Sequence, residues 1–157
     1  MRHKKVEKRI VEQDEVYNNR LVAKFINRLM RDGKKTVAQS LLYKAFDLIE
    51  QKKEDPLALF EGAIQNVGPK QEVKARRVGG ASYQVPAEVR GERKISLAIR
   101  WIIQAAKARS SKEFHTFSEK LAAELLDASQ NQGEAIKKKD AMQRMAEANK
   151  AFAHFRW

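Results

Sequence analysis

The sequence contains no cysteine, only 3 prolines and 7 glycines, and no long run of apolar residues. The lack of cysteine excludes disulfide bonds, thiolate metal sites and cysteine nucleophiles. A membrane-spanning helix needs about 20 consecutive apolar residues, and the basic N-terminus leads into no apolar signal segment, so neither a span nor a secretory signal is expected. The 157 residues are enough for one domain with a core, and the hydrophobic content of 43% argues against wholesale disorder.

Positive charge dominates the composition. Lys and Arg number 32 against 20 Asp and Glu, which leaves a net charge of +12. The net charge alternates along the chain, with values of +6, −2, +8, −4 and +4 in residues 1–35, 36–69, 70–112, 113–136 and 137–157. Folding can bring separated basic stretches onto one face, as binding to a phosphate backbone requires. The composition therefore predicts a cytoplasmic protein that binds a polyanion, with nucleic acid as the first candidate and an anionic membrane surface as the second.

The apolar periodicity predicts a mainly α-helical single domain in residues 18–157, after a basic extended arm in residues 1–17. About six helices are expected, over residues 19–31, 36–53, 56–67, 92–109, 117–128 and from 134 onward. Val37 is expected on the buried face of the second helix, and Met145 and Ala148 on that of the last. The two helices between residues 36 and 67 lie in an acidic block and are interpreted as scaffold.

Residues 71–90 interrupt the helical pattern. Two strand-like segments flank Gly79 and Gly80, which predicts a protruding two-stranded β-ribbon between the third and fourth helices. Pro86 cannot donate a hydrogen bond to a neighbouring strand, so its strand is expected at an edge. Because an isolated two-stranded ribbon is only marginally stable in water, we expect it to lie on another surface.

Basic residues form stripes on two of the expected helices. Arg20, Lys24, Arg28 and Arg31 share the polar side of the first helix without an acidic neighbour, and Arg93, Arg100 and Lys107 recur every seven residues on the fourth. A solvated charged face is the alternative interpretation of such stripes.

The ribbon carries its own cluster of cations. Arg76 and Arg77 lie beside the glycine tip, and a guanidinium group can hold phosphate oxygens bidentately. Cations that protect an exposed strand edge from aggregation are the alternative. The predicted RNA-binding residues of the whole chain are Arg2, Lys4, Lys5, Lys8, Arg9, Arg28, Arg31, Lys34, Lys35, Lys74, Arg76, Arg77, Arg93, Lys94 and Arg100.

No catalytic or metal-binding pattern is found. His3, His115 and His154 are too scattered for a metal triad. Residues 33–36 (GKKT) resemble the end of a phosphate-binding loop, but the earlier glycine of that motif would fall on Arg28, and a helix rather than a strand precedes it. The chain is therefore predicted to be no enzyme and to use no metal or cofactor.

The C-terminal residues 152–157 (FAHFRW) are rich in aromatic side chains. Such side chains can stack on bases, or they can dock on the chain's own core or on a neighbouring protein. Docking on protein is the interpretation that we favour.

Several segments resemble the bacterial small-subunit ribosomal protein seven family. The matching segments are LVAKFIN (21–27), MRDGKK (30–35), PKQEVKARRVGG (69–80), YQVP (83–86) and MAEANKAFAH (145–154). The resemblance covers residues 20–157 and departs at the N-terminus, where the chain is less rich in proline and arginine. It implies six helices with a protruding ribbon.

The resemblance also implies a function and partners. Family members are primary binders of small-subunit ribosomal RNA in the 3′ major domain, where they nucleate assembly of the subunit head. They lie near the exit-site transfer RNA and the messenger path, beside ribosomal proteins nine and eleven. Two other classes remain open from the residues alone. One is a DNA-compacting protein or general nucleic-acid chaperone, and the other is a helical adaptor whose basic faces meet acidic proteins or membrane.

Overall fold

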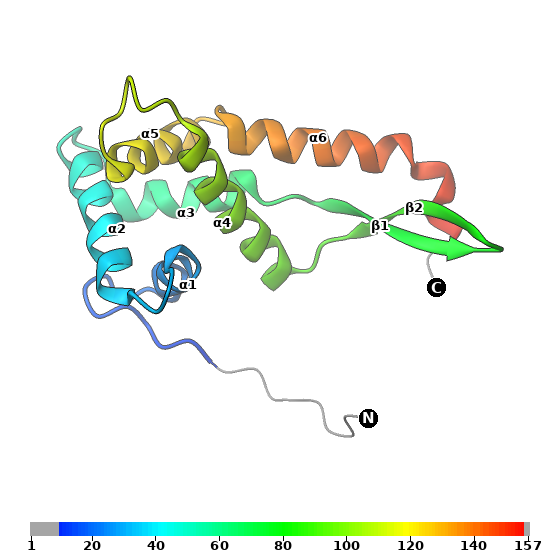
Figure 1. Cartoon of the computed structure of the whole chain (residues 1–157), viewed down its shortest axis with the longest axis horizontal. Coiled ribbons are helices and arrows are strands. Elements are labelled where there is room, and N and C mark those ends of the chain that lie inside the picture. The colour runs from blue at the N-terminus through cyan, green and yellow to red at the C-terminus, as the bar shows by residue number, and fades with distance from the viewer. Residues whose placement is uncertain (1–9, 156–157) are drawn as a thin grey trace.

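Six α-helices and a two-stranded antiparallel ribbon make up most of residues 10–155, the part of the chain that this computed structural model describes (Figure 1). The elements are α1 (Arg20–Leu29), α2 (Lys35–Glu50), α3 (Pro56–Val67), β1 (Gln71–Val78), β2 (Ala81–Glu88), α4 (Gly91–Ala108), α5 (Phe117–Ser129), α6 (Glu134–Ala148) and the 3-10 helix η1 (Lys150–Phe155). The predicted helical fold, with its ribbon between the third and fourth helices, is confirmed. The short helix η1 was not predicted.

Local sequence signals set several helix boundaries. Asn19 caps α1 by accepting a hydrogen bond from the backbone N–H of Leu21 at 2.7 Å. Asp55 caps α3, whose first residue is Pro56. Thr116 and Glu119 form the two halves of a capping box at the start of α5. These helices therefore begin where short-range hydrogen bonding favours a start.

Three phenylalanines lie at the centre of the helical core. The ring of Phe60 is 5.4 Å from the rings of both Phe25 and Phe46, and all three side chains are fully buried. They come from α1, α2 and α3, and the edge-to-face geometry adds about 0.5–1.5 kcal/mol per pair beyond the burial itself. The other large, fully buried side chains of this core are Val22, Ile26, Leu42, Ile49, Val67, Ile102, Leu121 and Leu125.

Three residues that were predicted to point inward are exposed, at the edges of two helix faces that are otherwise buried as expected. Val37 is 53% exposed, because α2 buries the face that carries Ala38 and Leu42. Met145 is 43% exposed and Ala148 is also exposed. Helix α6 buries Ala135, Ile136 and Ala146, and the partly buried Met142 packs against the same core. Large apolar side chains weigh more in a pattern than alanines, so the narrow alanine stripe was overlooked.

The ribbon projects from the helical body, and α6 and η1 lie along it (Figure 1). Its strands pair in register, with Val73 opposite Pro86 and Arg76 opposite Tyr83. The ring of Tyr83 lies 5.2 Å from the rings of both Phe152 and Phe155. The surface on which the ribbon was expected to lie is therefore formed by the C-terminal part of the same chain, and these two aromatic residues dock on protein.

The last residues of the expected arm are docked on α2. The carboxylate of Asp14 is buried and accepts hydrogen bonds from the backbone N–H groups of Val16 and Tyr17. The Tyr43 hydroxyl donates to the same carboxylate at 2.8 Å, and burial together with this hydrogen bond raises the pKa of Tyr43 to about 12. The ring of Tyr17 packs against Phe46 at 5.1 Å. Residues 14–17 therefore form a packed turn rather than extended chain.

Candidate nucleic-acid interface

Cations of α1 and α4 converge around one hollow. The two helices pack against each other, so that the basic stripes predicted on each of them become neighbours. Arg28 from α1 and Arg100 and Lys107 from α4 line a hollow of about 400 Å³, together with Ile103 and Gln104. Lys107 was recognised in the α4 stripe but was left out of the predicted RNA-binding residues. The spacing of seven residues between Arg100 and Lys107 was the sequence signal that places Lys107 on the same face.

The charges on this face are not neutralised within the described part of the chain. Between residues 10 and 155, no ion pair joins Arg28, Arg31, Arg100 or Lys107 to a carboxylate. Burial, and then the nearby charge of Arg31, lower the pKa of Lys107 below its ordinary value. The charged form of Lys107 is thus disfavoured in the folded chain, first by burial and second by a neighbouring cation. This face, defined by Arg28, Arg31, Arg100 and Lys107, is called the α1–α4 basic face below.

The turn between α1 and α2 extends this face. A second hollow of about 330 Å³ is lined by Arg31, Lys34 and Lys107, with Met30, Val37 and Phe117 among its apolar residues. Lys35 begins α2, whose first turn contains no acidic residue. A cation at a helix N-terminus opposes the helix dipole and costs stability. Lys34 and Lys35 are thus placed at a position that favours an anionic partner.

The ribbon carries a separate group of cations, away from the α1–α4 basic face. Arg77 pairs with Ser82 beside the tip, and Arg76 pairs with Tyr83. Arg76 also lines a hollow of about 660 Å³ between the ribbon and the start of α4, together with Lys74, Arg90 and Arg93. Arg90 was not among the predicted residues, although it lies in the basic block that the sequence indicated.

A buried carboxylate holds two of the predicted cations. Glu72 on β1 is 4% exposed, and both of its oxygens accept from Arg93 Nε at 2.8 Å. Lys74 Nζ lies 3.3 Å from the same carboxylate. The hydrogen bonds from Arg93 hold the pKa of Glu72 below its ordinary value of 4.5. Arg93 therefore fastens the ribbon to α4, whereas Lys74 pairs with Glu72 within β1. More than half of each cationic side chain stays exposed to a ligand.

Lys94 packs against the end of α3. Its aliphatic stem crosses Gly68 so closely that a Cβ atom at this position would lie 2.6 Å from Lys94 Cε. The stem is thus part of the junction between α3 and α4, and this packing restricts where the Lys94 ammonium group can lie.

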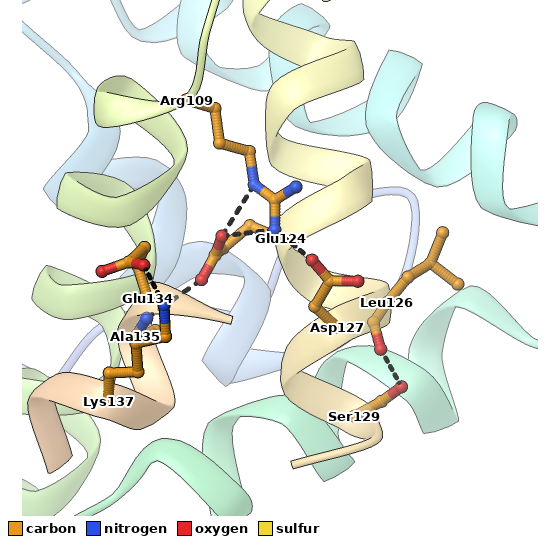
Figure 2. Close-up of polar contacts among 8 residues, drawn as sticks. All are labelled: Arg109, Glu124, Leu126, Asp127, Ser129, Glu134, Ala135 and Lys137. Atoms are coloured by element: carbon orange, nitrogen blue, oxygen red, sulfur yellow. Dashed lines mark hydrogen bonds and ion pairs between the residues drawn. The ribbon is translucent and has the colours of Figure 1, made fainter. Parts of the chain in front are cut away.

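Arg109 takes part in a network of polar contacts within the fold (Figure 2). Its guanidinium group contacts Glu124 Oε2 through Nε at 2.7 Å and through Nη2 at 2.6 Å, and it also contacts Asp127. The other oxygen of Glu124 accepts from the backbone N–H of Ala135 at 3.1 Å. This network joins the end of α4 to α5 and to the start of α6, so Arg109 stabilises the fold rather than the basic face.

The remaining predictions concern regions or groups outside these surfaces. Arg2, Lys4, Lys5, Lys8 and Arg9 lie outside the described residues, as does Trp157. Within residues 10–155, no cluster of three or more His, Cys, Asp or Glu side chains could hold a metal ion. Over the same span, every helix is too short or too polar to cross a bilayer.

Residues 1–150 match the family described as Ribosomal protein S7p/S5e. The chain belongs to this family. Proteins named small ribosomal subunit protein uS7 are similar to it over 99% of both chains at 59% identity in Syntrophobacter fumaroxidans and at 57% in Magnetococcus marinus. The protein of the same name in Thermotoga maritima is 54% identical over 100% of both chains.

Membership in this family makes the chain a structural constituent of the small ribosomal subunit. It therefore acts in translation, as part of the ribosome in the cytoplasm. The prediction that the chain is no enzyme agrees with the family, whose members are structural proteins. The two other classes left open by the residues, a DNA-compacting protein and a helical adaptor, are not what the family indicates.

Proposed function

We propose that this chain is a primary binder of small-subunit ribosomal RNA in the 3′ major domain, and that its binding nucleates assembly of the subunit head. The observation that carries the proposal is the convergence of Arg28, Arg100 and Lys107 on one hollow, without a carboxylate partner among residues 10–155. Cations that lie close together repel one another in the free protein, and bound phosphates would remove this repulsion.

The arrangement favours recognition of a folded RNA by its shape. Cations on rigid helices hold fixed positions, so they fit phosphates only where the RNA backbone follows a matching path. The α1–α4 basic face and the cations of the ribbon lie on different parts of the molecule, and together they span an RNA junction rather than one helix. Lys34 and Lys35 extend the first surface, while Arg76 and Arg77 provide the second.

The neighbours belong to the same proposal. The family resemblance supports a position near the exit-site transfer RNA and the messenger path, with ribosomal proteins nine and eleven beside the chain. The projecting ribbon supports it as well, because an element that extends from the body reaches beyond the primary RNA site (Figure 1). The predicted contacts of residues 2–9 remain part of this proposal.

The test is a binding titration with a fragment of the ribosomal RNA head domain and with duplex DNA as competitor, at several salt concentrations. Replacing Arg28, Arg100 and Lys107 by Gln is expected to weaken RNA binding and to reduce the slope of log affinity against log salt by about one unit per lost phosphate contact. The double variant R76A/R77A is expected to weaken binding while helicity and thermal stability stay nearly unchanged.

A matched control removes three cations elsewhere. Lys44, Lys52 and Lys112 are exposed and lie outside both basic surfaces. Their replacement by Gln changes the net charge equally, so equal losses in both triple variants would mean that only total charge matters. Equal affinity of the unchanged chain for RNA and duplex DNA would instead favour a general nucleic-acid chaperone.

A further inference from the structure

A groove between α1 and α4 lies beside the α1–α4 basic face and differs from it in chemistry. It has a volume of about 510 Å³, within the range of about 300–1,000 Å³ that small-molecule sites occupy. Its floor is apolar, with Ile95 and the buried Ile99, and its rim carries Asn27 and Ser96. Val11, just beyond the docked turn of the arm, closes one side.

Arg28 connects the groove to the basic hollow. Its side chain lines both, so that the two depressions are adjacent along α1 and α4. A nucleotide has two parts that match these two depressions. Its phosphate suits the basic hollow, and its flat base with polar edges, one sugar away, suits the groove. Phosphates held by Arg28, Arg100 and Lys107 would leave the attached base next to an apolar floor.

The charges around the groove favour a base over a second phosphate. Glu92 lines the groove at the beginning of α4, so its lining contains a carboxylate beside the cations of Lys24 and Arg28, unlike the hollow of Arg28, Arg100 and Lys107. The Asn27 amide has both donors and an acceptor, and the Ser96 hydroxyl has both functions as well. The aliphatic stems of Lys24 and Arg28 add apolar walls with a positive outer edge.

We propose that this groove receives one unstacked base of the bound ribosomal RNA, and that Asn27 and Ser96 contact the edge of this base. The inference rests on the proposed RNA-binding function and adds a base-reading contact to it. Proteins that recognise RNA sequence do so mainly at unpaired nucleotides, whose bases leave the stack. The surface formed by α1 and α4 therefore combines a basic hollow for phosphates with a groove for a base.

The variant Ser96→Leu tests the groove without changing any charge. Ser96 is exposed on α4, and leucine is a good helix former, so the helix is expected to persist while the added side chain fills the groove. The matched control is Ser40→Leu, the same change at an exposed position of α2. Far-UV circular dichroism and a urea midpoint establish that both variants are folded. Asn27→Ala provides a second test should Ser96→Leu not fold.

The readouts are affinity for the head-domain fragment, the salt slope, and chemical probing of base edges on the bound RNA with dimethyl sulfate and a carbodiimide. Ser96→Leu is expected to weaken binding about tenfold, with the salt slope unchanged. One or two unpaired nucleotides should be protected by the unchanged chain and by Ser40→Leu but exposed with Ser96→Leu.

The outcomes separate the two proposals. Selective RNA binding with the same affinity and the same protected bases in Ser96→Leu and Asn27→Ala would overturn the groove assignment alone, and would leave the groove to an apolar segment of a neighbouring protein. Lack of selective RNA binding by the unchanged chain would overturn the proposed function and, with it, the base contact.

Discussion

At the scale of single residues, Glu124 shows how a strongly basic chain uses one buried anion. The carboxylate is fully buried, and both of its oxygens are occupied, one by Arg109 and the other by the N–H of Ala135 (Figure 2). Gly133 approaches the same group at a φ of +91°, where a Cβ atom would lie 3.0 Å from Glu124 Oε1. Since a buried charge without partners is costly, the fold depends on all of these contacts together.

Replacement of Arg109 by Met is therefore expected to destabilise the chain strongly. The change leaves the Glu124 carboxylate buried and without its cation, which typically costs about 3–5 kcal/mol in the free energy of unfolding. Because Arg109 is itself partly exposed, the lower end of this range is expected. Urea denaturation followed by circular dichroism measures the change.

A matched control is available in the same region. Lys137→Met removes an ion pair with Glu134 in which both side chains are exposed, and such pairs contribute little. Its urea midpoint should stay where it is. Equal midpoints for Arg109→Met and Lys137→Met would show that Glu124 does not need its buried partner.

At the scale of elements, α6 lies along the ribbon, and side chains attach the ribbon at two further places. Glu72 fastens its base to α4 through Arg93, and Tyr83 rests on Phe152 and Phe155 of η1 nearer its tip. A free two-stranded ribbon is marginal in water, so both attachments are needed to hold Arg76 and Arg77 in place. The fold thus positions the ribbon's cations through contacts that lie far apart in the sequence.

The base of the ribbon is expected to loosen in acid. The pKa of Glu72 is lowered in the folded chain, so its contribution to stability is complete above 4.5 and is lost as the pH falls through the lower, folded-state value. The variant Glu72→Gln lacks this contribution at neutral pH as well. We expect the free energy of opening the ribbon to fall by about 1–2 kcal/mol.

Amide hydrogen exchange of residues 71–88 at pH 7 measures the effect. Exchange in the ribbon should quicken in Glu72→Gln, while the amides of α2 and α3 keep their protection. Glu113→Gln, a change at an exposed loop residue, is the control. Unchanged exchange in the ribbon would mean that α6 and η1 hold it without the Glu72–Arg93 contact.

At the scale of the whole molecule, the net charge of +12 is concentrated rather than spread. Burial of the Lys107 ammonium group, and then the nearby charge of Arg31, disfavour the charged lysine in the free protein, and the lowered pKa of Lys107 reports this cost. A lysine with a lowered folded-state pKa destabilises the fold while it is charged, and this cost disappears as the pH rises above its ordinary value of 10.5. Stability and RNA affinity therefore oppose each other at this position.

Lys107→Gln is accordingly expected to raise the urea midpoint at pH 7 and to lower the affinity for the head-domain RNA fragment. The gain in urea midpoint should shrink above pH 10.5, where Lys107 is neutral in both the folded and the unfolded chain. Lys112→Gln, outside the face, should leave both quantities nearly unchanged. A lower midpoint in Lys107→Gln would show that its charge supports the fold instead of opposing it.

Much of the fold and part of the candidate surface could be predicted from local signals. The helix periods, the caps at Asn19, Asp55 and Thr116, and the glycine pair of the ribbon act over a few residues, so they are readable in order along the chain. The stripe on each helix was readable as well, because a helical period places its residues on one side. The narrow alanine face of α6 was missed, since its signal is weak.

The sequence by itself determined that this chain is a mainly helical, strongly basic protein with a ribbon after its third helix, because periodicity, caps and charge are local properties. Only the tertiary structure decided that Arg28, Arg100 and Lys107 share one hollow, that Glu72 and Glu124 are buried partners of arginines, and that the aromatic tail supports the ribbon. Each of these contacts joins segments from different elements, and its geometry depends on how the helices pack around the common core.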